Sequence, residues 1–170
     1  MTTQSATGTK IVSYLKTIGI VNNAPVGRGF ANPYDLKVSG DGRIFVLNRG
    51  APVFSRVGVC NLNEDYLYEF ASHGDGDGQF RLPAGIALDS KHERVFVTDE
   101  YNHRVSIFDA ARGDFLSKWG AHGSESGELD GPAGIALDAD DNAYIVDQHN
   151  NRVQKFTADG KLILKWGEQG

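Results

Sequence analysis

A repeated stretch of sequence limits the possible folds of this chain more than any other feature. Residues 82–119 begin LPAGIALD and end in tryptophan, and residues 131–166 begin GPAGIALD and end in tryptophan. The two copies are offset by 49 residues at their prolines and by 47 at their final tryptophans, so they differ in length only within the loops. A repeat of this length is typical of proteins built from small units that stack side by side.

Each copy is predicted to form four short β-strands. In the first copy these are residues 85–89, 95–99, 105–109 and 115–119, which are short apolar runs or alternate apolar and polar residues. Polar or glycine-containing turns separate them, as expected for hairpins. No apolar pattern with the period of a helix runs long enough to compete. A repeated four-stranded antiparallel sheet is the signature of a β-propeller blade, so the sequence predicts an all-β fold.

The copies resemble the NHL-repeat family of β-propellers. The resemblance rests on the two PAGIALD runs, on the turns DEYNHRV at 99–105 and DQHNNRV at 147–153, and on the Trp-Gly pairs that end the copies. A looser third copy precedes them, so the resemblance covers roughly residues 27–170. It implies a six-bladed ring, of which this chain looks like an N-terminal half or a fragment.

One propeller segment is predicted to fill residues 10–170, after a flexible tail at residues 1–9. Its expected parts are an outer strand at 11–20 and three blades at 32–70, 82–119 and 131–166. Three blades in a row leave two apolar faces without a neighbour. Either the chain is part of a longer ring, or two copies close head to tail, and self-association through these faces is a further expectation.

Composition limits the partners. The chain has 22 acidic and 17 basic residues, so its net charge of −5 predicts no nucleic-acid partner. It has no long apolar run and no signal-peptide pattern at its first residues, which predicts no membrane partner and a cytoplasmic location. The single cysteine, Cys60, lies in an apolar run and is interpreted as a small buried hydrophobic residue.

Chain direction places the candidate binding residues on one face. The turns between second and third strands and the loops between blades must lie at the same end of a blade, and we call this end the loop face. Loops on a rigid frame commonly carry function. The candidate ligand-binding residues on or near this face are Tyr34, Asp35, Asn48, Arg49, His73, Asp99, His103, His122, Asp147 and His149.

The repeated polar residues of the turns have two interpretations. Asp99, Asn102 and Arg104 recur as Asp147, Asn150 and Arg152. They are either a ring of ligand contacts or a device that holds the turns through backbone hydrogen bonds and ion pairs. Repetition favours the second interpretation, because a binding site is normally unique whereas a fold device is copied.

No metal site and no cofactor are predicted from linear motifs. The acidic stretches at 75–78 and 138–142 lack the glycine and glutamate that a calcium loop of the EF-hand type requires, and there is no HExxH or paired CxxC motif. Related amidating lyases carry histidines on the inner strands around a central zinc, and this resemblance would place them at Tyr34, Ala84 and Ala133. An enzyme of the lyase or lactonase type with a channel metal site is therefore the less favoured alternative.

The first blade departs from the repeat. Asn48 stands where Asp99 stands later, and residues 49–55 contain an insertion. In the same blade Tyr34 replaces a small residue and Asp35 replaces the repeated glycine. Such a break indicates either a functional site or drift in the first blade. The resulting expectation is a scaffold, with no enzymatic activity favoured, that binds a protein, peptide or small molecule on its loop face.

Overall fold

The computed structural model describes residues 29–50, 52, 54–89 and 93–167. The tail predicted at 1–9 and the outer strand predicted at 11–20 lie outside these residues. Within the described part of the chain there is no helix with the length and apolar character needed to cross a membrane.

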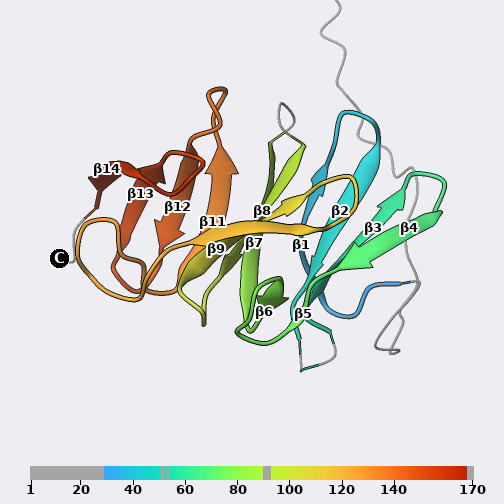
Figure 1. Ribbon diagram of the computed structural model, residues 1–170, viewed down its shortest axis with the longest axis horizontal. Helices are drawn as coiled ribbons and strands as arrows, with labels where there is room; N and C mark the ends of the chain where they lie inside the picture. The colour runs from blue at the N-terminus through green and yellow to red at the C-terminus, as the bar shows by residue number, and fades with distance from the viewer. Residues whose placement is uncertain (1–28, 51, 53, 90–92, 168–170) are drawn as a thin grey trace, which may run out of the picture.

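The fold consists of three four-stranded antiparallel sheets, each built from consecutive strands, which lie side by side as blades (Figure 1). The strands of blade one are β1 (Pro33–Val38), β2 (Arg43–Asn48), β3 (Arg56–Asn61) and β4 (Tyr66–Phe70). Those of blade two are β7 (Pro83–Asp89), β8 (Arg94–Asp99), β9 (Arg104–Asp109) and β10 (Phe115–Trp119). Those of blade three are β11 (Pro132–Leu137), β12 (Ala143–Asp147), β13 (Arg152–Phe156) and β14 (Leu162–Trp166). The predicted all-β fold with propeller-type blades is confirmed.

Each inner strand starts in the same way. β1, β7 and β11 begin with a proline, and the pairing with the next strand shifts in register directly after it. Proline has no backbone N–H to donate, so it is tolerated where the ladder begins or bulges. Between blades one and two, β5 (Ser72–His73) and β6 (Gln79–Phe80) form a short parallel pair within the connecting loop.

Two cores hold the blades together. Between blades one and two lies a cluster that we call the first interblade core; its large buried members are Phe45, Phe70, Phe80, Ile86 and Phe108. Between blades two and three lies a second cluster; its large buried members are Phe96, Ile107, Leu129, Ile145 and Phe156. Both clusters join residues far apart in sequence, so the blades stabilise one another.

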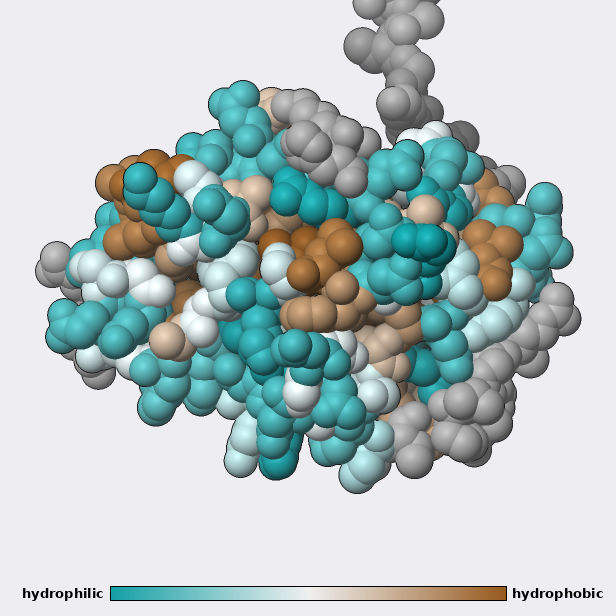
Figure 2. Space-filling model, viewed as in Figure 1, coloured by the Kyte–Doolittle hydropathy of each residue, from teal (hydrophilic) through white to brown (hydrophobic). Residues whose placement is uncertain are grey.

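The two outward blade faces differ. On blade one, Ile44, Val46 and Cys60 are buried beside Phe30, and burial raises the pKa of the Cys60 thiol. Blade three exposes four large apolar side chains, which are Val146, Ile163, Leu164 and Trp166. Figure 2 shows apolar side chains gathered over β14.

Gly85 lies where the inner strands of blades two and three approach each other closely. A Cβ atom at Gly85 would lie 2.6 Å from the carbonyl oxygen of Ala133 on β11 and 3.1 Å from Oγ1 of Thr98. Thr98 donates a hydrogen bond of 2.5 Å to the same carbonyl oxygen. The matching glycine of blade three, Gly134, has more room, because its nearest contact would be a Val146 methyl at 3.3 Å.

The substitution Gly85→Ala is therefore expected to lower the free energy of unfolding by about 1–3 kcal/mol, since the added methyl must push the β11 backbone away. Urea denaturation measures this change. Gly134→Ala is the matched control, and it is expected to stay within about 0.5 kcal/mol of the unmodified chain. Equal losses in both variants would show that the β7–β11 contact is not the tight point.

Candidate functional site

Two buried carboxylates fix the loops of the loop face. Asp99 is fully buried and accepts hydrogen bonds from the backbone N–H groups of Arg81 and Leu82, both at 2.9 Å. Asp147 is also fully buried and accepts one of 2.7 Å from the backbone N–H of Asp130 and one of 2.7 Å from Nε of Arg152. Each carboxylate thus ties a blade's second strand to the loop that enters the same blade.

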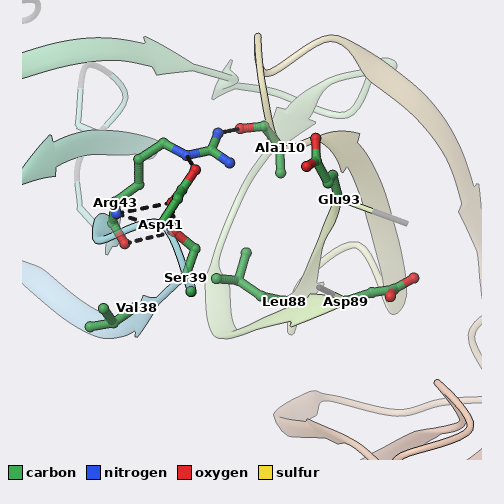
Figure 3. A pocket seen from close by; sticks show the side chains of 9 residues that line it. Val38, Ser39, Asp41, Arg43, Leu88, Asp89, Glu93 and Ala110 are labelled. Atoms are coloured by element: carbon green, nitrogen blue, oxygen red, sulfur yellow. Dashed lines mark hydrogen bonds and ion pairs between the residues drawn. The ribbon is translucent and has the colours of Figure 1, made fainter. Parts of the chain in front are cut away.

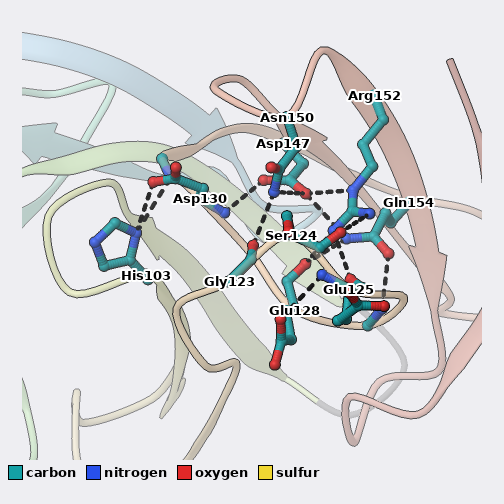
Figure 4. A network of polar contacts seen from close by, with 12 residues as sticks. His103, Gly123, Ser124, Glu125, Glu128, Asp130, Asp147, Asn150, Arg152 and Gln154 are labelled. Atoms are coloured by element: carbon teal, nitrogen blue, oxygen red, sulfur yellow. Dashed lines mark hydrogen bonds and ion pairs between the residues drawn. The ribbon is translucent and has the colours of Figure 1, made fainter. Parts of the chain in front are cut away.

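The repeated arginines hold the loops that precede their blades. Arg104 donates to the carbonyl oxygens of Asp75, Gly76 and Gln79, each at 2.8 Å. Arg152 does the same with a second set of carbonyl oxygens, at 2.7 to 2.8 Å, from Ser124, Glu125 and Glu128. Figure 4 shows the second set together with Asp147 and Gln154. Because these side chains are buried and most of their polar atoms are engaged within the fold, they shape the loop face and present little to a ligand.

Of three other predicted site residues, Asp35 and Asn48 make side-chain hydrogen bonds within the fold. Asp35 is half-buried, and its Oδ2 accepts a hydrogen bond of 3.0 Å from the backbone N–H of Ile86, which joins β1 to β7. Asn48 is fully buried and donates to the carbonyl oxygen of Val46 at 3.1 Å. His73 is half-buried, and its Nδ1 is a buried atom without a hydrogen-bond partner.

A group of aromatic and charged side chains lies at the junction of blades one and two, with its two tyrosines exposed and its arginines and glutamate partly buried. The guanidinium of Arg49 lies 4.5 Å from the ring centre of Tyr34 and pairs with Glu100 at 2.8 Å. The guanidinium of Arg81 lies 5.0 Å from the ring centre of Tyr101. Glu100 and Tyr101 are adjacent in the turn between β8 and β9, so the two sets of contacts are neighbours on the loop face. We call these five residues the tyrosine–arginine surface.

A second group lies at the junction of blades two and three, where three histidines surround one carboxylate. Oδ1 of Asp130 lies 3.4 Å from Nδ1 of His103, 3.5 Å from Nε2 of His122 and 3.3 Å from Nδ1 of His149. The rings of His103 and His122 are 4.1 Å apart between centres. We call these four residues the histidine cluster. Three of them were candidate residues, whereas Asp130 was missed.

The backbone places the cluster. His103 has a left-handed φ of 50°, as does the matching Asn151 at 51°. Gly131 has a φ of 64°, and a Cβ there would lie 2.8 Å from the ring of His149. Burial lowers the pKa of His103, and the neighbouring His122 lowers it further, while Asp130 acts in the opposite direction. The neutral form of His103 is therefore favoured.

A pocket of about 420 Å³ opens at the opposite end of blades one and two. Three of its four charged side chains, those of Asp41, Arg43 and Asp89, are paired with each other or with a near neighbour. Nε of Arg43 lies 2.8 Å from Asp41, and Asp89 pairs with Arg94 at 2.5 Å. Figure 3 shows Arg43 extending past Asp41 to the carbonyl oxygen of Ala110. The pocket thus offers a ligand few free polar groups among the described residues.

Comparisons with known proteins agree with the repeat. The NHL repeat pattern matches residues 80–108 and 129–156. The human NHL repeat-containing protein 3 is 31% identical over 87 residues, which are 50% of this chain and 24% of that protein. The mouse protein of the same name is 29% identical over the same length. The matched region is thus about a quarter of these relatives.

Solved structures share the fold. Hydrazine synthase of Kuenenia stuttgartiensis superposes with a TM-score of 0.63 and 17% identity, over 93% of this chain and 41% of that one. A catalytically inactive virginiamycin B lyase from Staphylococcus aureus with quinupristin superposes with a TM-score of 0.61 and 16% identity, over 87% of this chain and 43% of that one. At such identities the likeness shows the fold alone. Two matches to the NHL repeat therefore cover most of blades two and three, within a β-propeller fold.

Proposed function

We propose that this chain is a binding scaffold whose loop face takes a protein, a peptide or a small molecule, with a peptide segment as the best fit. The observation that carries the proposal is the tyrosine–arginine surface. Tyr34 is 55% exposed and Tyr101 is 58% exposed, although both are large aromatic residues. Tyrosine and arginine are enriched where proteins bind one another, because they combine apolar area with polar groups.

The same surface is ordered before any ligand arrives. Arg49 is held by Tyr34 on one side and by Glu100 on the other. Arg81 is held by Tyr101 and by Asp75, at 2.6 Å. Side chains that are already ordered lose less conformational entropy on binding. This supports a role in recognition for the pattern break in blade one.

The enzyme alternative has less support. The second residues of the three inner strands are Tyr34, Ala84 and Ala133. Two of these side chains are methyl groups that cannot ligate a metal or transfer a proton. The virginiamycin B lyase shares the fold, and a shared fold alone does not carry a catalytic activity.

The test is to select a random-peptide display library on the 170-residue chain and to measure the dissociation constant of the strongest peptide by isothermal titration calorimetry. We expect Tyr34→Ala and Tyr101→Ala each to weaken binding by roughly 5- to 30-fold, because truncating an interface anchor costs about 1–2 kcal/mol. Leu116→Ala is the control, since Leu116 is 50% exposed on β10. It is expected to leave the affinity unchanged.

Two outcomes would contradict the proposal. One is a selected peptide whose affinity is the same for the unmodified chain and for both tyrosine variants. The other is a library from which no sequence is enriched over a background selection on the Tyr34→Ala/Tyr101→Ala double variant.

A further inference from the structure

We infer that His103, His122 and Asp130 bind a divalent transition metal ion, for which Zn²⁺ is the best match, with His149 next in reach as a fourth ligand. The site lies at the junction of blades two and three. It is separate from the tyrosine–arginine surface and does not depend on that surface binding a ligand.

The spacing of the donor atoms supports a shared metal ion. A tetrahedral zinc site with bonds of about 2.0–2.2 Å separates neighbouring ligand atoms by about 3.3–3.5 Å. The three nitrogens of the histidine cluster lie 3.3 to 3.5 Å from the same oxygen of Asp130. These distances exceed the usual 2.7–3.2 Å of an N–H···O hydrogen bond. The three N···O distances are therefore those expected between co-ligands of one ion, and only the contact between His149 and Asp130 also qualifies as a long hydrogen bond.

His103 has conflicting neighbours without a metal ion. Its Nδ1 lies 3.3 Å from the backbone N–H of Gly131 and 3.4 Å from the carboxylate of Asp130. A protonated Nδ1 would face the N–H of Gly131, and an unprotonated Nδ1 would face a carboxylate lone pair. No protonation state satisfies both neighbours. A cation between His103 and Asp130 removes the repulsion between the two lone pairs.

The cluster occurs at one of the two described blade junctions. At the junction of blades one and two the loop histidine is present as His73, but the position of Asp130 holds Arg81 and that of His149 holds Tyr101. An arginine at the centre of the other junction cannot ligate a metal. Unlike the buried Asp and Arg residues, the histidine cluster is thus not a copied fold device.

The carboxylate at the centre is held in place by its backbone. The N–H of Asp130 donates to Asp147 at 2.7 Å, and its carbonyl oxygen accepts from the N–H of His149 at 3.0 Å. One donor atom from each of His103, His122 and Asp130 lies within 4.8 Å of the others. His122 is 65% exposed, so its side chain can rotate by the small amount that closes the site. An ion can also reach the site directly from solvent.

The donor types select the class of metal. Imidazole nitrogens favour zinc, copper and nickel, whereas calcium and magnesium prefer sites made of oxygen alone. Two imidazoles and one carboxylate, with a third imidazole beside them, match the ligand sets of zinc sites. We therefore expect Zn²⁺ to bind and Mg²⁺ to fail at equal concentration.

The test is isothermal titration calorimetry of Zn²⁺ into the 170-residue chain after treatment with a chelator and dialysis. We expect one ion per chain. We expect each of three variants to weaken Zn²⁺ binding at least about 100-fold: His103→Asn, His122→Ala and Asp130→Asn. Even the loss of a residue that only orients a metal ligand lowers metal affinity by about 10–100-fold. His149→Ala is expected to weaken it less. The visible absorption of bound Co²⁺ gives a second readout of the coordination geometry.

The variants are chosen to preserve the fold. Asparagine at position 103 matches Asn151, which has the same backbone conformation in blade three. His73→Ala is the matched control, because it removes the loop histidine at the other junction, and it is expected to leave the Zn²⁺ affinity unchanged. Thermal unfolding confirms that each variant is folded. The inference is overturned if no Zn²⁺ binds, or if the three ligand variants bind it as tightly as the His73→Ala chain.

Discussion

Phe108→Ala is expected to lower the free energy of unfolding by about 3–5 kcal/mol, the usual cost of removing a buried phenylalanine. Phe108 is fully buried on β9. Its ring centre lies 5.0 Å from that of Phe70, 5.5 Å from that of Phe80 and 5.9 Å from that of Phe115. The substitution removes the aromatic ring that joins blade one, its loop and blade two. Urea denaturation followed by circular dichroism measures the loss.

Two further variants show whether the loss comes from packing. Phe108→Leu keeps most of the apolar volume and is expected to cost clearly less than Phe108→Ala. Leu67→Ala alters a side chain that is 42% exposed on β4 and is expected to stay within about 0.5 kcal/mol. A loss below about 1 kcal/mol for Phe108→Ala would mean that the blades are not held by this core.

The strands could be predicted because each carries its own pattern. The stretch expected at 95–99 is observed as β8 (Arg94–Asp99), and that expected at 115–119 is observed as β10. The inner strand expected at 85–89 begins two residues earlier, at Pro83. Proline argues against a central strand when sequence is read alone, yet here it occupies the position before the register shift, where no N–H is needed.

The short pair β5–β6 could not be predicted. Its loop holds His73 and three glycines between Gly74 and Gly78, and such a stretch has no alternation of apolar and polar residues. The pairing instead depends on Arg104, which binds three carbonyl oxygens of the loop from a strand about thirty residues away in sequence. A contact of this kind has no local signal.

The polar sites were predictable to different degrees. Repetition alone favoured a fold role for Asp99 and Asp147, and both side chains are buried in hydrogen bonds to the loops. The histidine cluster had no such signal, because its members come from two turns and one interblade loop. One difference between the copies could have indicated it. The position that holds Arg81 in the first copy holds Asp130 in the second, so the charge near the loop histidine is reversed.

Asp147→Ala is expected to lower the free energy of unfolding by about 3–5 kcal/mol, because it leaves a buried arginine without its carboxylate. Oδ2 of Asp147 accepts hydrogen bonds from Arg152 at 2.7 Å, from Asn150 at 3.0 Å and from Gln154 at 3.1 Å. Its Oδ1 accepts from the backbone of Asp130. All four donors lose their partner together, and none of them gains water easily in a buried site. Urea denaturation again measures the loss.

The matched variant in blade two, Asp99→Ala, shows how much of the stability comes from the ion pair and how much from the hydrogen bonds to the loop backbone. Asp99 accepts from the backbone of Arg81 and Leu82 as Asp147 accepts from Asp130, but Nε of Arg104 is a buried atom without a hydrogen-bond partner. Asp99→Ala thus removes hydrogen bonds without breaking a direct ion pair. It is expected to lower the free energy of unfolding by about 1–3 kcal/mol. If the Asp99 variant is the less stable of the two, the blade-three ion pair contributes little, and the backbone bonds alone hold the loops. The larger loss for Asp147→Ala would instead assign the difference to Arg152 and Gln154, the two side-chain donors of Asp147 that have no counterpart at Asp99.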